Sequence, residues 1–211
     1  MILLTDKIEF PDPTQADPDG LLAVGGDLSV KRLLLAYKSG VFPWFNDDNT
    51  FILWWSPNPR FVLFPERLKV SKSMTQVLRN KGFTVTINQD FESVILECSK
   101  AKRQGQAGTW ITYEMIKAYT KLHYLGYATS VEVWQNEMLV GGLYGVDLGN
   151  GVFCGESMFA KVSNASKVAF ITFIQNTNYK LIDCQVYTNH LASLGAEEIE
   201  RSEFLEYLKE D

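Results

Sequence analysis

Hydrophobic and polar residues alternate most regularly in the stretch from Ala128 to Met158. This stretch holds three apolar segments separated by short polar runs, at residues 130–134, 138–148 and 152–158. Alternation with a period of two is typical of β-strands, and the polar runs, one of them Gly149-Asn150-Gly151, are typical of tight turns. The pattern therefore predicts a three-stranded antiparallel meander.

Other segments repeat their apolar residues at the spacing of an α-helix. Thr112 can cap a helix whose Met115, Tyr119 and Leu122 form one apolar face, and a helix is expected between Ser29 and Gly40. Further helices are predicted near residues 72–81, 90–99, 164–175 and 202–208, with strands at residues 83–87 and 180–186. We therefore expect an α+β fold in which helices pack on a mostly antiparallel sheet.

The first part of the chain differs from the rest in its proline content. All seven prolines fall within the first 65 residues, so short elements joined by turns are expected there. Longer elements with regular periods follow. We predict a small N-terminal domain over residues 1–65 and a larger domain over residues 66–211, with the boundary between residues 62 and 68.

Charge and composition narrow the classes of function. The 211 residues carry a net charge of -5, which argues against a protein that wraps nucleic acid through clustered Lys and Arg, so any RNA contact should be local. The N-terminus lacks the basic region of a signal peptide, and no apolar run is long enough to span a membrane, so a cytoplasmic protein is expected. Three widely spaced cysteines and two distant histidines, His123 and His190, fit neither a disulfide framework nor a metal site. We expect both histidines to be structural or surface residues.

Several short strings have the character of motifs. They include Gly-Val-Phe-Pro-Trp-Phe at residues 40–45, Leu-Trp-Trp-Ser-Pro at 53–57, Phe-Cys-Gly-Glu-Ser-Met-Phe at 153–159 and Ile-Asp-Cys-Gln-Val at 182–186. With the strings at residues 20–27 and 108–112, and in this order, they closely resemble the bacterial leucyl/phenylalanyl-tRNA-protein transferase family. The resemblance extends over nearly the whole chain.

The resemblance implies a fold, a reaction and partners. It implies that the larger domain is a GNAT-like acyltransferase domain. It implies transfer of Leu, Phe and sometimes Met from aminoacyl-tRNA to acceptor proteins with an N-terminal Lys or Arg, which marks them for degradation. No cofactor or metal is required, because the aminoacyl ester is already activated. A monomer that does not act at a membrane is expected.

The resemblance also implies catalytic roles for Asp183 and Gln185. Residues two apart on a strand share a face, so these side chains should point the same way. By themselves they would read as buried polar groups satisfied by hydrogen bonds, but the motif match favours catalysis. The acceptor α-amine has a pKa of about 7.7 to 8.0 and is partly neutral at physiological pH, so the enzyme chiefly has to orient it. We expect Gln185 to accept a hydrogen bond from the amine, while Asp183 holds the amide or helps to take charge as the proton leaves.

Glu156, in the third strand of the meander, is the predicted acceptor-binding residue. Its carboxylate could bind the Lys or Arg side chain of the acceptor, or its ammonium group, by a charge-assisted hydrogen bond. The alternative is a strand-end glutamate that faces water.

Three further sets of residues match family positions. An apolar pocket for the aminoacyl side chain is expected from Leu143, Phe153, Met158, Phe173 and Ile182, for which an ordinary core is the alternative. Trp44 and Trp110 are expected to stack on the 3′ adenosine of tRNA. A basic cluster near a predicted helix, which a solvated helix face would also explain, is expected to contact tRNA phosphate through Lys69, Lys72, Arg79 and Lys81.

Two other functions remain open on the sequence. An acetyl-CoA-dependent acetyltransferase of the same fold would hold the pyrophosphate with a glycine-rich turn at a helix N-terminus, yet the link over residues 159–165 contains no glycine. A peptide- or RNA-binding module without activity is expected to have lost Asp183, Gln185 or Glu156, and all three are present.

Overall fold

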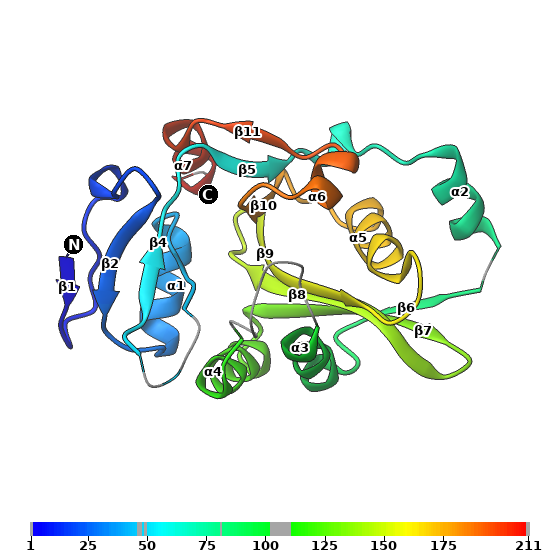
Figure 1. The fold of residues 1–211 in the computed structure, drawn as a ribbon, viewed down its shortest axis with the longest axis horizontal. Helices are drawn as coiled ribbons and strands as arrows, with labels where there is room; N and C mark the ends of the chain where they lie inside the picture. Colours follow the sequence, from blue (N-terminus) through cyan, green and yellow to red (C-terminus); the bar gives the residue numbers. More distant parts are fainter. Residues whose placement is uncertain (1, 46–47, 49, 81, 102–110, 210–211) are drawn as a thin grey trace.

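The computed structural model describes residues 2–45, 48, 50–80, 82–101 and 111–209. Its N-terminal part forms a four-stranded sheet in the order β1-β2-β4-β3, which stands beside the larger part of the molecule in Figure 1. The strands of this sheet are β1 (Ile2–Leu4), β2 (Leu21–Gly25), β3 (Phe42–Pro43) and β4 (Leu53–Trp55).

One helix, α1 (Val30–Lys38), packs on this sheet. The Ser29 side chain caps its first turn by accepting a hydrogen bond from the backbone N–H of Arg32. Leu33, Ala36 and Tyr37 follow at helical spacing and are buried, so the helix predicted between Ser29 and Gly40 is confirmed.

The second sheet has seven strands in the order β11-β5-β10-β9-β8-β7-β6. Its strands are β5 (Arg60–Leu63), β6 (Thr84–Ile87), β7 (Ala128–Gln135), β8 (Met138–Asp147), β9 (Val152–Ala160), β10 (Leu181–Gln185) and β11 (Glu197–Ile199). β7, β8 and β9 pair antiparallel, which confirms the predicted meander, whereas β10 runs parallel to β9 and antiparallel to β5. The mostly antiparallel α+β layout is thus confirmed.

Helices cover both faces of the second sheet (Figure 1). α3 and α4 lie on one face and α5 on the other, while α2 lies at the edge of the molecule. The helices are α2 (Lys72–Arg79), α3 (Phe91–Lys100), α4 (Tyr113–Tyr124), α5 (Ala165–Gln175), α6 (Asn189–Ser193) and α7 (Arg201–Lys209). None of them, within the part of the chain described, is long and apolar enough to cross a membrane.

Close contact between α5 and β8 depends on a glycine. A Cβ atom built at Gly141 would lie 2.5 Å from the Cβ of Ala165 at the start of α5. Any larger residue would therefore push the helix away from the sheet. The small pair sets the depth at which α5 sits, and with it one wall of the cavity described below.

Short elements are where the sequence interpretation is incomplete. The pattern of the sequence does not predict β5 or β11, which have four and three residues, and it does not predict α6. Such short elements show no full period of hydrophobic residues, and the two strands are held by pairing with distant segments. The chain passes from the first sheet to the second between Trp55 and Arg60; the division into domains of residues 1–65 and 66–211 stays a prediction.

Candidate active site

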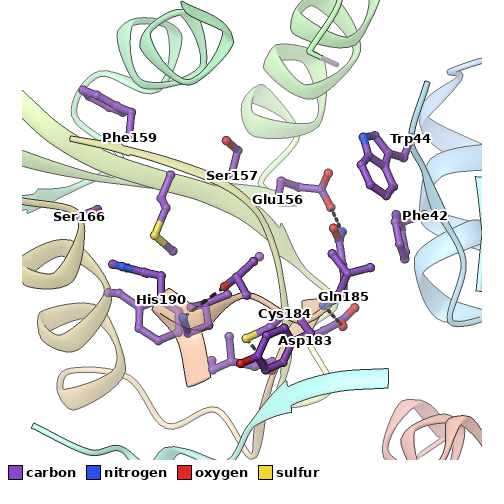
Figure 2. Close-up of a pocket in the computed structure, with 18 of the residues that line it drawn as sticks. Phe42, Trp44, Glu156, Ser157, Phe159, Ser166, Asp183, Cys184, Gln185 and His190 are labelled. Carbon is purple, nitrogen blue, oxygen red and sulfur yellow. Dashed lines mark hydrogen bonds between the residues drawn. The ribbon is translucent and has the colours of Figure 1, made fainter. Parts of the chain in front are cut away.

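A cavity of about 700 Å³ opens where β9 and β10 separate. The two strands pair in parallel only as far as the Asp183 and Cys154 positions. Beyond that point the cavity is lined by residues 155–160 of β9 and residues 182–188 in and after β10. Phe42 and Pro43 of β3, in the first sheet, and the following Trp44 line it on another side, as Figure 2 shows for Phe42 and Trp44. Both sheets thus contribute to one site.

Gln185 has an unusual backbone conformation at the centre of this cavity. Its φ is 64°, a left-handed value that costs a non-glycine residue on the order of 1–3 kcal/mol. The pairing of β10 with β5 shifts register between Asp183 and Gln185. The strand alternation expected from the sequence therefore does not extend to Gln185, because the left-handed residue interrupts it. The shift lets the Gln185 side chain turn toward β9.

Two hydrogen bonds hold Gln185 in place (Figure 2). Its backbone N–H donates to Oδ1 of Asp183 at 2.9 Å, and its side-chain Nε2 donates to Oε1 of Glu156 at 2.7 Å. With Nε2 directed at Glu156, the amide presents its carbonyl oxygen in another direction. That oxygen is the atom able to accept a hydrogen bond from an amine.

Asp183 is fully buried and bound to an arginine. Arg60, at the start of β5, donates from Nε to Oδ1 at 2.8 Å and from Nη2 to Oδ2 at 2.6 Å. Such a two-pronged pair is strong and geometrically specific. Asp183 is close to Gln185 as expected, but it holds the backbone N–H of Gln185 and not the side-chain amide.

Glu156 is buried and hydrogen-bonded, with 7% of its surface exposed. The alternative of a strand-end glutamate facing water is therefore wrong. Oε2 accepts a hydrogen bond of 3.0 Å from the hydroxyl of Tyr119, and that hydroxyl is itself hydrogen-bonded to the hydroxyl of Tyr37. Hydrogen bonds thus link Asp183, Gln185, Glu156, Tyr119 and Tyr37 into one polar network. The network extends from β10 and β9 to α4 and α1.

Burial governs the protonation of this network. Burial is the largest cause of a rise in the pKa of Glu156 to about 7; the charge of Asp183 contributes to this rise, and hydrogen bonds from Tyr37, Tyr119 and Gln185 limit it. Burial, followed by the charge of Glu156, raises the pKa of both tyrosines well above the ordinary value. Both tyrosines therefore keep their hydroxyl protons, and Glu156 is the group in this network that changes charge near neutral pH.

The predicted apolar residues divide between the cavity wall and the core. Met158 and Ile182 line the cavity. Leu143, Phe153 and Phe173 are at most 3% exposed and belong to the hydrophobic core around it, with the rings of Phe153 and Phe173 4.7 Å apart between centroids. These three residues support the wall and do not form it.

Of the two tryptophans predicted to stack on the 3′ adenosine, the structure describes Trp44. Trp44 is half-buried and lines the cavity. Its ring lies 6.0 Å from that of Trp55, and Trp55 donates from Nε1 to the Trp44 carbonyl oxygen at 2.8 Å. Trp55 thus fixes the segment that carries Trp44. Trp110 lies outside the described residues.

Three of the four predicted phosphate-binding residues, Lys69, Lys72 and Arg79, lie outside the cavity wall. Lys72 and Arg79 are exposed on α2, which Figure 1 shows beyond α5. Lys69 is exposed shortly before α2, and its backbone N–H donates to the carbonyl oxygen of Leu194 at the end of α6. Lys81 lies outside the described residues. None of these three described residues lines the cavity, and their contact with phosphate stays a prediction.

Sequence reasoning missed four residues of the site. Arg60, Tyr37 and Tyr119 belong to the polar network, and His190 lines the cavity from α6. His190 Nε2 is buried and makes no hydrogen bond to the described residues, and burial followed by the charge of Lys167 lowers its pKa. One signal was available for Arg60, a charged residue heading the apolar run at residues 61–64. In the described ranges, no three His, Cys, Asp or Glu side chains converge as metal ligands.

The sequence comparisons match nearly the whole chain to one family. Residues 62–209 match the family model described as leucyl/phenylalanyl-tRNA protein transferase, and residues 26–58 match the model of that family's N-terminal domain. The chain is 58% identical to the leucyl/phenylalanyl-tRNA protein transferase of Flavobacterium johnsoniae, with 99% of each chain covered. It is 54% identical to that of Pectobacterium carotovorum, with 99% of this chain and 89% of that one covered. A GCN5-related N-acetyltransferase from Kribbella flavida aligns over 78% of this chain and 58% of its own, with a TM-score of 0.39 and 12% identity.

Proposed function

Because the chain belongs to the leucyl/phenylalanyl-tRNA protein transferase family, we propose that it transfers an aminoacyl group from tRNA to the N-terminus of a protein. The donor is tRNA charged with Leu, Phe or Met, and the acceptor is a protein with an N-terminal Lys or Arg that is thereby marked for degradation. The observation that carries the proposal is the cavity in which Gln185, Glu156 and Trp44 lie together. A monomer acting in the cytoplasm, where charged tRNA is available, completes the proposal.

The reaction exchanges one bond for another without a cofactor. The acceptor α-amine nitrogen forms a bond to the ester carbonyl carbon, and the bond between that carbon and the 3′ ribose oxygen of tRNA breaks. The amine loses a proton and the departing ribose oxygen gains one. Since the ester is activated and the amine is partly neutral at physiological pH, orientation of the two groups supplies most of what the protein must add.

Gln185 is the residue proposed to orient the amine. Its Nε2 donates to Glu156, so its carbonyl oxygen is the free end of a fixed amide that can accept a hydrogen bond from the attacking nitrogen. Asp183 is proposed to keep Gln185 in its left-handed conformation through the bond to the backbone N–H. A glutamine is a poor base, so its role is positioning of the nucleophile.

Glu156 is the residue proposed to recognise the positively charged first residue of the acceptor. It lines the cavity and has a pKa of about 7, so it is partly ionised before any ligand arrives. A cationic Lys or Arg side chain nearby favours the ionised form and gains a charge-assisted hydrogen bond in return. An acceptor with an apolar first residue brings no positive charge to stabilise the ionised carboxylate of Glu156.

Selection of the aminoacyl group is proposed to occur at the apolar side of the cavity. Met158 and Ile182 line it together with Phe170, and the core residues Leu143, Phe153 and Phe173 support these from behind. A pocket of this kind separates apolar side chains of similar size only modestly. Leu, Phe and Met are therefore all expected to be accepted.

Contact with tRNA is proposed at two places. Trp44 lies at the cavity, where an aromatic face can hold the terminal adenine, and Trp110 is proposed to share this role. Lys69, Lys72, Arg79 and Lys81 are proposed to contact phosphates of the acceptor stem. With a net charge of -5, the chain has to rely on such local contacts.

Replacing Trp44 with alanine is expected to raise KM for charged tRNA roughly tenfold, because stacking of a base on an aromatic ring contributes about 1–3 kcal/mol. The Trp44→Phe variant keeps an aromatic face and should stay within about threefold of the wild type. Steady-state transfer rates measured against the concentration of charged tRNA test this. Equal KM values for the alanine variant and the wild type would exclude stacking at Trp44.

The function itself is tested with radiolabelled Leu or Phe on tRNA. The acceptors are three peptides of the same sequence that begin with Lys, with Ala, or with an acetylated Lys. We expect label on the free Lys peptide, little on the Ala peptide and none on the acetylated one. Folded protein that transfers label to none of the peptides would refute the proposed function.

A further inference from the structure

Arg60 is a fully buried cation next to the proposed site. It is 1% exposed and its partner Asp183 is 0% exposed, so water cannot stabilise either charge. Burying two ions is costly unless their geometry is good and their other hydrogen-bonding groups are satisfied. Both conditions hold, since Nε and Nη2 bind the two carboxylate oxygens at 2.8 and 2.6 Å and Nη1 donates to the carbonyl oxygen of Gly40 at 3.3 Å.

Two aromatic rings enclose the guanidinium group. Its central carbon lies 4.7 Å from the centroid of Phe42 and 4.6 Å from that of Phe204. Contacts of this kind between a cation and ring faces are favourable, and they are stronger where water is excluded. Phe42 comes from the first sheet and lines the cavity, whereas Phe204 comes from α7. Arg60 thus joins the first sheet, the C-terminal helix and β10 at one point.

The contacts form a chain that ends at the proposed amine-orienting group. Arg60 fixes Asp183 from one side, and Oδ1 of Asp183 accepts the backbone N–H of Gln185 at 2.9 Å. That backbone carries the left-handed φ of 64°, which needs support from its surroundings to persist. In this conformation the Gln185 side chain points at Glu156 and donates to it at 2.7 Å.

We propose that Arg60 is a positioning residue for aminoacyl transfer, acting through Asp183 to hold the backbone and side chain of Gln185 in the orientation that receives the acceptor amine. The inference rests on the proposed function. Arg60 touches neither substrate in this role, so its loss should lower kcat and leave the binding of charged tRNA nearly unchanged. A small displacement of an orienting group can cost about a hundredfold in rate.

Lysine cannot replace arginine here. A guanidinium group has a planar fork that binds both carboxylate oxygens while its faces stack on rings, whereas an ammonium group is a compact point charge. The Arg60→Lys variant keeps the charge that Asp183 requires and loses the two-pronged geometry. We expect its kcat to fall about tenfold or more, with KM for charged tRNA changed less than about threefold.

The matched control is a second buried arginine. Arg32 on α1 is 0% exposed and binds Asp27 and the carbonyl oxygen of Thr5, but it does not line the cavity. The Arg32→Lys variant is expected to lower the melting temperature while keeping the kcat of the folded protein. This control separates the loss of a buried arginine as such from the loss of this one.

A double-mutant cycle with Gln185 distinguishes positioning from general support of the fold. If Arg60 acts through Gln185, then Arg60→Lys should lower kcat in the wild-type background and have less than about a twofold effect in the Gln185→Ala background. An effect of equal size in both backgrounds, or no effect in either, would overturn the inference. Should Arg60→Lys fail to fold, Phe204→Leu removes one of the two rings around the guanidinium group and enters the same cycle.

The same assay separates failure of this inference from failure of the proposed function. Transfer by the wild type with no dependence on Arg60 leaves the function standing and removes the positioning role. If the folded wild type transfers no aminoacyl group, the proposed function is refuted, and the positioning role of Arg60 is refuted with it.

Discussion

The Gln185→Ala variant should transfer aminoacyl groups about a hundredfold more slowly than the wild type while remaining folded, because it removes the fixed carbonyl oxygen that we propose orients the attacking amine. The side chain also satisfies Glu156 through the 2.7 Å hydrogen bond, so some loss of stability is expected in addition. Single-turnover rates with a Lys-initiated peptide, at saturating charged tRNA, measure the effect on the chemical step.

Two further variants separate the amide from the backbone. Gln185→Gly adopts the left-handed conformation without strain, so a rate as low as that of the alanine variant would assign the loss to the missing amide. Gln175→Ala is the matched control, since Gln175 is exposed at the end of α5. Transfer by Gln185→Ala at the wild-type rate would eliminate the orienting role.

Glu156 should lower the stability of the folded protein as the pH rises from about 5 to 8. The pKa of Glu156 is about 7 in the folded state and 4.5 in the absence of its surroundings. Between these values the folded state binds more protons at this site than the unfolded state, so the free energy of unfolding decreases with pH. At 1.36 kcal/mol for each pKa unit, the decrease from this group is about 3 kcal/mol and is complete slightly above pH 7.

The Glu156→Gln variant provides the reference for this measurement. It keeps an oxygen that can accept from Tyr119, and it has no charge to lose or gain. His190 contributes with the opposite sign, because its pKa is lowered and protonation at low pH favours the unfolded state. Both proteins share that contribution, so the difference between their urea unfolding free energies at pH 5, 6, 7 and 8 isolates Glu156. A difference that does not change with pH would mean that Glu156 does not titrate in this range.

The elements with a clear period could be predicted from the sequence. Met115, Tyr119 and Leu122 recur at helical spacing, and all three are fully buried on α4. The meander follows from alternation and from its turn residues, because both are local properties. β5 and β11 could not be predicted in this way, since they pair with each other across a long stretch of sequence and β5 pairs also with the distant β10.

The candidate site was predictable in part. The resemblance pointed to Asp183, Gln185, Glu156 and Trp44, and these lie together around one cavity. The partner of Asp183 was not predictable, because Arg60 is 123 residues away in sequence. The left-handed Gln185 was not predictable either, since its conformation depends on the register shift against β5. A strand pattern read from the sequence assumes an uninterrupted ladder.

The proposed roles of Gln185 and Glu156 are tested most directly by locating the amino acid added to a peptide that begins with Lys and carries both an α-amine and an ε-amine. Tandem mass spectrometry of the product, formed with Phe-charged tRNA and the wild-type chain, assigns the position. With Gln185 orienting the α-amine and Glu156 binding the side chain, we expect one Phe in peptide linkage at the α-amine. Addition at the ε-amine, or at both amines equally, would contradict these roles.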